Sequence, residues 1–201
     1  PMVRMRPPKI PEELQPVRTE QEFRRLIKAC EGTEFADRRD MALVRLFMDS
    51  GARRAEISNL RVEDVDFDQN VVLVMGKGAR PRACPFARKT AQALDRYLRA
   101  RSRRRDAGSP SLWLGHGGPM TDSGIAQAVR ERAVRAGLEG FHLHEFRHGF
   151  AHGWLAAGGQ ENDLMRLAGW KSRQMMGHYA ASAADERARD AHRRMALGDR
   201  F

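Results

Sequence analysis

Residues 144–148 read His-Glu-Phe-Arg-His, and the interpretation of the whole chain turns on this stretch. His144 and Arg147 lie three residues apart, so a helix through this segment places both side chains on one face. The same five residues also fit the H-E-x-x-H pattern of zinc peptidases, in which two histidines four residues apart bind the metal. The other motifs of the chain have to distinguish these two interpretations.

Three further stretches carry chemically suggestive residues. They are Gly51-Ala52-Arg53-Arg54-Ala55-Glu56-Ile57, Gly76-Lys77-Gly78 in a predicted hairpin turn, and Leu167-Ala168-Gly169-Trp170, nine residues before Tyr179. Together with residues 144–148 they resemble, in order and spacing, four boxes of the phage integrase family of tyrosine site-specific recombinases. The family's arginine box is usually G-L-R-x-S-E-L and its histidine box H-x-L-R-H. The resemblance covers roughly residues 18–197.

Departures from the family pattern are mild. Ala52 and Phe146 each replace the usual leucine, and Ala55 replaces the usual serine or glycine. All three residues keep small or apolar character, so the fold implied by the resemblance is unaffected. Trp170 stands where the family has histidine or tryptophan.

The resemblance implies that Tyr179 attacks a DNA phosphorus and forms a covalent 3′-phosphotyrosine. Negative charge then builds on the non-bridging oxygens, which two guanidiniums can clamp by forked hydrogen bonds. Arg53 and Arg147 are assigned to this clamp, because an arginine keeps its proton near neutral pH. Lys77 is expected to protonate the leaving 5′-oxygen. The covalent bond preserves the phosphodiester energy, so no cofactor, metal or ATP is expected.

The remaining catalytic assignments concern one histidine and one tryptophan. His144 can hydrogen-bond the phosphate or take the tyrosine proton. Trp170 can donate its indole N–H to the phosphate and pack the site with its ring.

Two residues are interpreted as supporting the site. Glu56 either orients a site residue or is a plain i,i+3 partner of Arg53, and His148 either supports the site or is structural.

Several assignments have rivals. Arg54 could be the phosphate ligand in place of Arg53, although Gly51 and Glu56 flank Arg53 at the family's spacing. Lys77 could be a solvated turn lysine. Tyr97, the second of the two tyrosines, sits on an apolar helix face and is expected in the core.

The zinc peptidase interpretation lacks a clear third ligand. The extended peptidase motif needs glycine and histidine where the chain has Ala151 and Trp154, although His142, His152 or Glu161 could contribute. It also explains neither the other three boxes nor the net charge of +10. Two further alternatives remain: a type IB topoisomerase-like enzyme, which relaxes DNA without synapsis, and a non-catalytic DNA-binding relic.

Composition agrees with a polyanionic partner. The pI is about 10.7, and 31 of the 36 basic residues are arginine, since lysine occurs five times. Expected partners are double-stranded DNA attachment sites. The resemblance adds a tetramer in the synapse, formed from a protein that is monomeric without DNA, and accessory DNA-bending or directionality factors. The expected reaction is integration of a phage or other mobile element.

The cellular setting is inferred from what the sequence lacks. Cys30 and Cys84 show no metal-ligand spacing and are expected to be reduced, buried thiols. No apolar run approaches the ~20 residues that span a membrane, and no signal peptide is evident. A cytoplasmic, nucleoid-associated protein is expected, with no membrane partner.

The expected fold is mixed α/β and mainly α, with a small three-stranded antiparallel sheet at one edge. Residues 1–17 are rich in proline and predict a linker, and residues 18–201 form the catalytic domain, so the family's N-terminal core-binding domain is expected to be missing. The expected elements, by residue number, are helices at 19–30, 37–50, 53–60, 90–101, 121–136, 143–157, 161–168, 171–180 and 185–197, and strands near 65–67, 71–75 and 83–85.

Two segments keep open alternatives. The arginine-rich run 101–105 is either a solvated helix end or a specific DNA contact. The C-terminal helix packs either on its own domain or on a neighbouring subunit.

Overall fold

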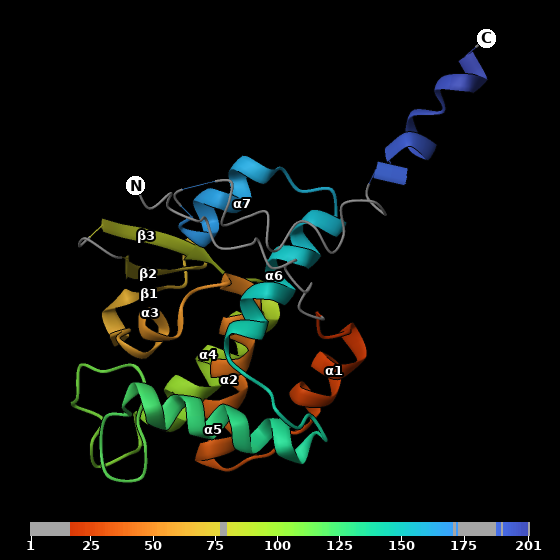
Figure 1. Cartoon of the computed structure of the whole chain (residues 1–201). Helices are drawn as coiled ribbons and strands as arrows, with labels where there is room; N and C mark the ends of the chain where they lie inside the picture. Colours follow the sequence, from red (N-terminus) through yellow and green to blue (C-terminus); the bar gives the residue numbers. More distant parts are fainter. Residues whose placement is uncertain (1–16, 77–79, 171, 173–187, 190, 201) are drawn as a thin grey trace, which may run out of the picture.

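The structure, a computed structural model, describes residues 17–76, 80–170, 172, 188–189 and 191–200, and it is mainly helical with one small sheet (Figure 1). This confirms the expected fold class. The elements in chain order are α1 (Glu20–Lys28), α2 (Phe35–Ser50), α3 (Arg54–Ser58), the 3-10 helix η1 (Val62–Asp64), β1 (Val65–Asp66), β2 (Val71–Gly76), β3 (Arg80–Pro85), α4 (Arg88–Arg101), α5 (Asp122–Arg135), α6 (His144–Ala156), α7 (Glu161–Ala168) and the 3-10 helix η2 (Leu197–Arg200).

Local sequence signals explain where several helices begin and end. A capping box, Thr19 followed three residues later by Glu22, opens α1: the backbone N–H of Glu22 donates to Thr19 Oγ1 at 3.3 Å, and that of Thr19 donates to Glu22 Oε2 at 2.8 Å. At the start of α5 the Thr121 hydroxyl accepts from the backbone N–H of Gly124 at 3.1 Å. Gly51 and Gly169 end α2 and α7 in the left-handed conformation, which glycine adopts without steric penalty.

The sheet has the order β1-β2-β3 with antiparallel pairing and lies at one edge of the molecule (Figure 1). The strands fall where the sequence predicts them, but two of the apolar residues that suggested β2 lie on its outer face. Leu73 and Met75 are 45% and 60% exposed, whereas Val72, Val74 and Cys84 are buried. The reason is that β2 turns its even-numbered residues toward the body of the protein, where it contacts α3.

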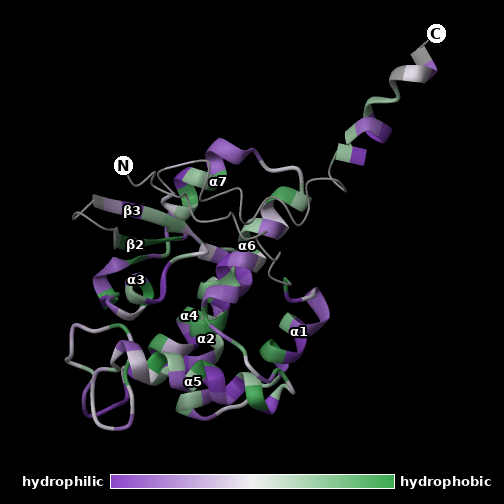
Figure 2. Ribbon diagram, in the orientation of Figure 1, coloured by the Kyte–Doolittle hydropathy of each residue, from purple (hydrophilic) through white to green (hydrophobic). Residues whose placement is uncertain are grey.

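A cluster of aromatic rings joins α1, α2 and α6. The ring of Phe146 lies 5.9 Å from Phe23, 5.4 Å from Phe47 and 5.0 Å from Phe141. Around the helices of the body, apolar and polar residues alternate, as amphipathic helices require (Figure 2). The first residues of α6 are therefore fixed relative to α2 by packing, which matters for the site described below.

Tyr97 is a core residue, as predicted. It is fully buried, its hydroxyl donates to Leu112 O at 2.8 Å, and it accepts from the backbone N–H of Leu114 at 3.0 Å. Burial raises the pKa of the Tyr97 hydroxyl to about 12. Cys30 and Cys84 are likewise free, buried thiols, as expected.

The arginine-rich run 101–105 was expected to be either a solvated helix end or a DNA contact, and both expectations place all of its arginines at the surface. The structure instead shows that two of them are partly or fully buried. Arg101 is only 5% exposed and donates to the carbonyls of Ala107, Ser109, Ser111 and Leu112. Arg104 donates to Gly115 O at 2.9 Å. These two arginines stabilise the long loop before α5, because they donate hydrogen bonds to several of its backbone carbonyls. Arg103 and Arg105 are exposed.

Most of the expected 171–180 helix and part of the expected 185–197 helix fall outside the described residues. Residues 1–16, 171 and 173–187 belong to that part, which includes most of the expected 1–17 linker and the 171–180 helix. Residues 188–189 and 191–195 are helical, within the expected 185–197 helix. Among the described helices, none is both long and apolar enough to cross a membrane.

A buried ion-pair network ties α5 to α2. Arg132 Nε lies 2.8 Å from Asp40 Oδ2, and its Nη2 lies 2.8 Å from Asp37 Oδ1. Asp40 also pairs with Arg39. The side chains of Arg132 and Asp40 are 6% and 4% exposed, so each charge depends on its partner for solvation.

The substitution Asp40→Ala should therefore lower the free energy of unfolding by roughly 3 kcal/mol, because it leaves Arg132 buried with one carboxylate fewer. Urea denaturation measures this change. The control Glu63→Ala removes the exposed Arg61–Glu63 pair and should change stability by less than about 1 kcal/mol. Equal effects of the two substitutions would contradict a structural role for the Asp40 network.

Candidate active site

The buried guanidinium of Arg147 joins the ends of two helices. Its Nη1 donates to Gly51 O at 2.7 Å, at the end of α2, and its Nη2 donates to Ala168 O at 2.7 Å, at the end of α7. The last carbonyls of a helix lack intrahelical donors and carry partial negative charge, so a cation is favourable there. Arg147 thereby brings the first arginine box and the Leu167–Trp170 stretch together.

Trp170 lies against the same guanidinium. The Cζ atom of Arg147 is 4.9 Å from the centre of the Trp170 ring, within the range of a cation–π interaction. The ring is 5% exposed and belongs to a small apolar cluster with Leu155, Leu164 and Ala168. Three of the predicted site segments therefore meet at Arg147.

Glycine is required at both helix ends. A Cβ atom at Gly51 would lie 2.3 Å from the ring of Phe150, and one at Gly169 would lie 3.0 Å from Arg82 Nε. Both residues also have positive φ, 53° and 64°, which side chains rarely adopt. A side chain at Gly51 would overlap the Phe150 ring, and at Gly169 the positive φ and the tight contact with Arg82 both disfavour one.

Glu56 lies between two arginines. Its Oε1 accepts from Arg53 Nη1 at 3.0 Å, and its Oε2 accepts from Arg82 Nη2 at 2.6 Å. The backbone N–H of Arg53 also donates to Oε2, at 2.8 Å. Glu56 is therefore an i,i+3 partner of Arg53, and its carboxylate holds the Arg53 side chain in place.

The two candidate arginines of the first box point to different places. The side chain of Arg53 is 41% exposed although its partner Glu56 is 5% exposed, so its guanidinium is held and still open to a ligand. Arg54 instead pairs with Asp122 at the start of α5, at 2.6 Å. This arrangement favours Arg53 over Arg54 as the phosphate ligand.

Arg82 is the residue that sequence reasoning missed. It is 14% exposed, and besides Glu56 its guanidinium donates to Leu167 O and to Cys84 Sγ. Arg82 pairs with the buried Val74 across β2 and β3, so it starts from the inner face of the sheet. The signal was a charged residue two positions before the buried Cys84, on the same face of a strand.

The histidines line the start of α6. His144 is the first residue of this helix and is exposed, and its ring lies 5.5 Å from that of the half-buried His148. Burial lowers the pKa of His148, and the nearby His144 and Arg147 lower it further, against the opposing effect of Glu145. His148 is therefore neutral near pH 7.

Among the residues that the structure describes, no third ligand accompanies the H-E-x-x-H histidines. Within the part of the chain that it describes, no three His, Cys, Asp or Glu side chains gather into a metal-binding group. Glu145, which would be the general base of a zinc peptidase, pairs with Arg18 and accepts from the backbone N–H of His142.

Two predicted catalytic residues, Lys77 and Tyr179, lie outside the described residues. Residues 77–79, which include Lys77, follow Gly76 and precede Arg80, and these two residues pair at the ends of β2 and β3. The described residues thus bring together Arg53, Glu56, Arg147 and Trp170, with His144 and His148 at the start of the helix that carries Arg147.

Comparison with solved structures identifies the class of fold. The crystal structure of XerA recombinase matches with a TM-score of 0.80 and 27% identity, covering 95% of this chain and 67% of that one. A structure of the Tn1549 transposon integrase with transposon right end DNA matches with a TM-score of 0.74 and 20% identity, covering 94% and 68%. The described residues have the fold of a tyrosine recombinase catalytic domain.

Sequence comparison adds the family. The model of the phage integrase family matches residues 17–186. XerC of Pseudomonas aeruginosa (strain LESB58) is 32% identical over 165 residues, which cover 81% of this chain and 54% of the relative. XerD of Corynebacterium glutamicum is 35% identical over 164 residues, covering 79% and 54%. The chain spans about half the length of these curated relatives, and it belongs to the phage integrase family.

The lowered pKa of His148 predicts a pH effect on stability. The unfolded chain takes up a proton near pH 6.5, whereas folded His148 does so only at lower pH, so protonation favours the unfolded state. Stability should fall as the pH drops below 6.5 and level off below the pKa of folded His148. Urea denaturation across this range should show a smaller loss for His148→Gln. An NMR midpoint for His148 at or above 6.5 would contradict the assignment.

Proposed function

We propose that the chain is the catalytic part of a site-specific DNA recombinase that cuts and rejoins DNA through a covalent 3′-phosphotyrosine. The observation that carries this proposal is that Arg147 donates to the carbonyls of Gly51 and Ala168, which lie two residues before Arg53 and Trp170, and that it also lies against the Trp170 ring. Family membership supports it.

In this proposal the two guanidiniums bind the non-bridging oxygens of the phosphate under attack. They are positioned before DNA arrives, Arg147 by two helix ends and Arg53 by Glu56, so little reorganisation is needed as charge develops. Electrostatic preorganisation of this kind is a large contribution to catalysis in enzymes. The Trp170 ring packs beneath Arg147 and limits its movement.

Tyr179 is proposed as the nucleophile, Lys77 as the acid at the leaving 5′-oxygen, and His144 as the group that binds the phosphate or takes the tyrosine proton. The burial of Tyr97 supports the choice of tyrosine. Its hydroxyl is used in two core hydrogen bonds, and its pKa of about 12 disfavours the phenolate. Of the two tyrosines, Tyr179 is therefore the one left for attack on DNA.

We further propose that the reaction is the integration of a mobile element, carried out in the cytoplasm at attachment sites in double-stranded DNA. Two bound sites would be joined by a tetramer of the protein, with accessory DNA-bending or directionality factors. XerH, a structural neighbour with 19% identity, is described bound to its difH substrate. An attachment site beside the gene supports integration, and its absence contradicts it.

The nucleophile is tested with a nicked suicide duplex that carries the recombination site. Wild-type protein should form a covalent DNA adduct that resists EDTA, and Tyr179→Phe should abolish it while leaving DNA binding nearly unchanged. The matched control Tyr97→Phe should still form the adduct, at a temperature where it stays folded. An adduct with the Tyr179→Phe variant would contradict the proposal. A four-subunit synapse separates recombination from topoisomerase-like relaxation.

Arg82 is proposed to act through Glu56. By holding Oε2, it leaves Arg53 bound to Oε1 and keeps the remaining donors of Arg53 directed to a ligand. In Arg82→Gln the carboxylate would draw Arg53 into a bidentate pair, which Arg–carboxylate geometry favours. Adduct formation should slow by roughly tenfold.

A second substitution separates this positioning effect from a loss of packing. If Arg82 prevents Glu56 from forming a bidentate pair with Arg53, the double variant Arg82→Gln/Glu56→Gln should recover part of the lost rate. The reason is that the glutamine at position 56 has no negative charge to hold Arg53. Thermal denaturation of each variant identifies those that fold. A double variant slower than Arg82→Gln alone would contradict the competition between Arg82 and Arg53 for Glu56.

A further inference from the structure

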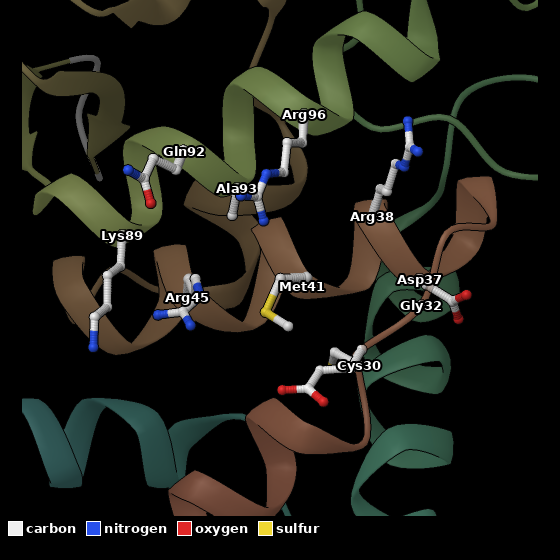
Figure 3. Close-up of a pocket in the computed structure, with 11 residues that line it drawn as sticks. Cys30, Gly32, Asp37, Arg38, Met41, Arg45, Lys89, Gln92, Ala93 and Arg96 are labelled. Carbon is white, nitrogen blue, oxygen red and sulfur yellow. The ribbon is translucent and has the colours of Figure 1, made fainter.

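A groove away from the site is lined by the two central helices α2 and α4 (Figure 3). It has a volume of about 450 Å³ and also borders the chain that follows α1. Four of its lining residues are basic, namely Arg38 and Arg45 from α2 and Lys89 and Arg96 from α4. None of the proposed site residues lines it.

The four groove cations are among the basic residues of the described chain that have no carboxylate partner, whereas ten arginines elsewhere do have one. Arg18, Arg24, Arg39, Arg53, Arg54, Arg61, Arg82, Arg99, Arg104 and Arg132 all form ion pairs with carboxylates. Across the described ranges, no ion pair involves Arg38, Arg45, Lys89 or Arg96. Like charges gathered without counterions repel one another, so this arrangement favours an anion from outside the chain.

The spacing of the cations suits an extended anion. Arg38 and Arg45 are seven residues apart on α2, as are Lys89 and Arg96 on α4, so each pair lies on one helix face about 10 Å apart. One strand of duplex DNA rises by a similar distance over about three nucleotides. Two such rows therefore suit a run of phosphates better than one small anion.

The groove has apolar residues between its basic rows and acidic residues toward one end. Met41 and Ala93 line it between the basic rows, giving apolar surface for the arginine stems. Asp37 lies at the end away from Arg45 and Lys89 (Figure 3), and its carboxylate is already paired with Arg132. Glu31 is the other acidic residue of the lining. The positive potential is therefore strongest at the end formed by Arg45 and Lys89.

We infer that this groove binds the phosphate backbone of a DNA segment, as a contact separate from the strand-cleavage site. Arginine matches phosphate by forked hydrogen bonds, and Lys89 adds a point charge at the groove mouth. Such contacts carry no sequence information, so the groove strengthens binding to any duplex. The choice of DNA as ligand rests on the proposed function, whereas the anion-binding character rests on the groove alone.

The test measures how the affinity of the 201-residue protein for a non-cognate duplex depends on salt. The variant Arg45→Ala/Lys89→Ala should reduce the slope of log K against log salt by roughly 2, since each phosphate contact contributes about 0.9. The matched control Arg24→Ala/Arg99→Ala removes the same net charge from two exposed arginines that are ion-paired within their own helices. Its slope should change by much less.

Three outcomes would overturn the inference. One is an equal change of slope in the groove variant and the control. Another is that sodium tripolyphosphate protects Lys89 from acetylation while duplex DNA does not, which would identify a small-anion site. The third is that poly-glutamate displaces the bound duplex from the protein as effectively as competing DNA does. Because no strand is cut, failure here leaves the Tyr179 adduct test unaffected, and failure of the adduct leaves the slope test unaffected.

Discussion

The buried guanidinium of Arg147 is the interaction on which the site depends. A buried charge is expensive unless acceptors replace water, and here the acceptors are carbonyls at the ends of α2 and α7. The same hydrogen bonds also satisfy the two carbonyls, which have no donors within their own helices. One side chain therefore stabilises two helix ends, and it fixes the distance between the arginine box and Trp170. Gly51 and Gly169 follow from this arrangement, since each ends a helix in the left-handed conformation.

Glu56 extends the same logic to Arg53. A carboxylate that is 5% exposed needs compensating donors, and it receives them from two arginines and one backbone N–H. Arg82 then connects this carboxylate to Leu167 O, next to the residue that Arg147 binds. The first box, β3 and the end of α7 are thereby joined by hydrogen bonds rather than by the apolar core. A substitution at any of these residues is therefore expected to shift the positions of the other side chains in the network.

The sequence indicates which residues belong to the motifs, but it does not indicate which other residues hold those side chains in place. Thr19, Thr121, Gly51 and Gly169 were readable because caps and helix stops are local, needing only the residues within one turn. Arg53 and Arg147 could be proposed as site residues because the boxes of this chain keep the order and spacing of the family's motifs. Arg82 was missed because its partners lie 26 and 85 residues away, so no local pattern reveals them. Likewise, the outward orientation of Leu73 and Met75 depends on which face of the sheet meets α3, a property of packing and not of alternation.

The abundance of arginine in the chain has two physical explanations, and the structure separates them. Arg101, Arg132 and Arg147 are nearly buried and satisfy carbonyls or carboxylates, so they act as scaffold donors despite their charge. Arginine suits this use because its planar fork reaches several acceptors at once. Net charge alone therefore overstates the surface available for DNA, because these residues are already committed to the fold. The charge that matters for a polyanion is the fraction without intramolecular partners, and four cations of this kind line the groove between α2 and α4.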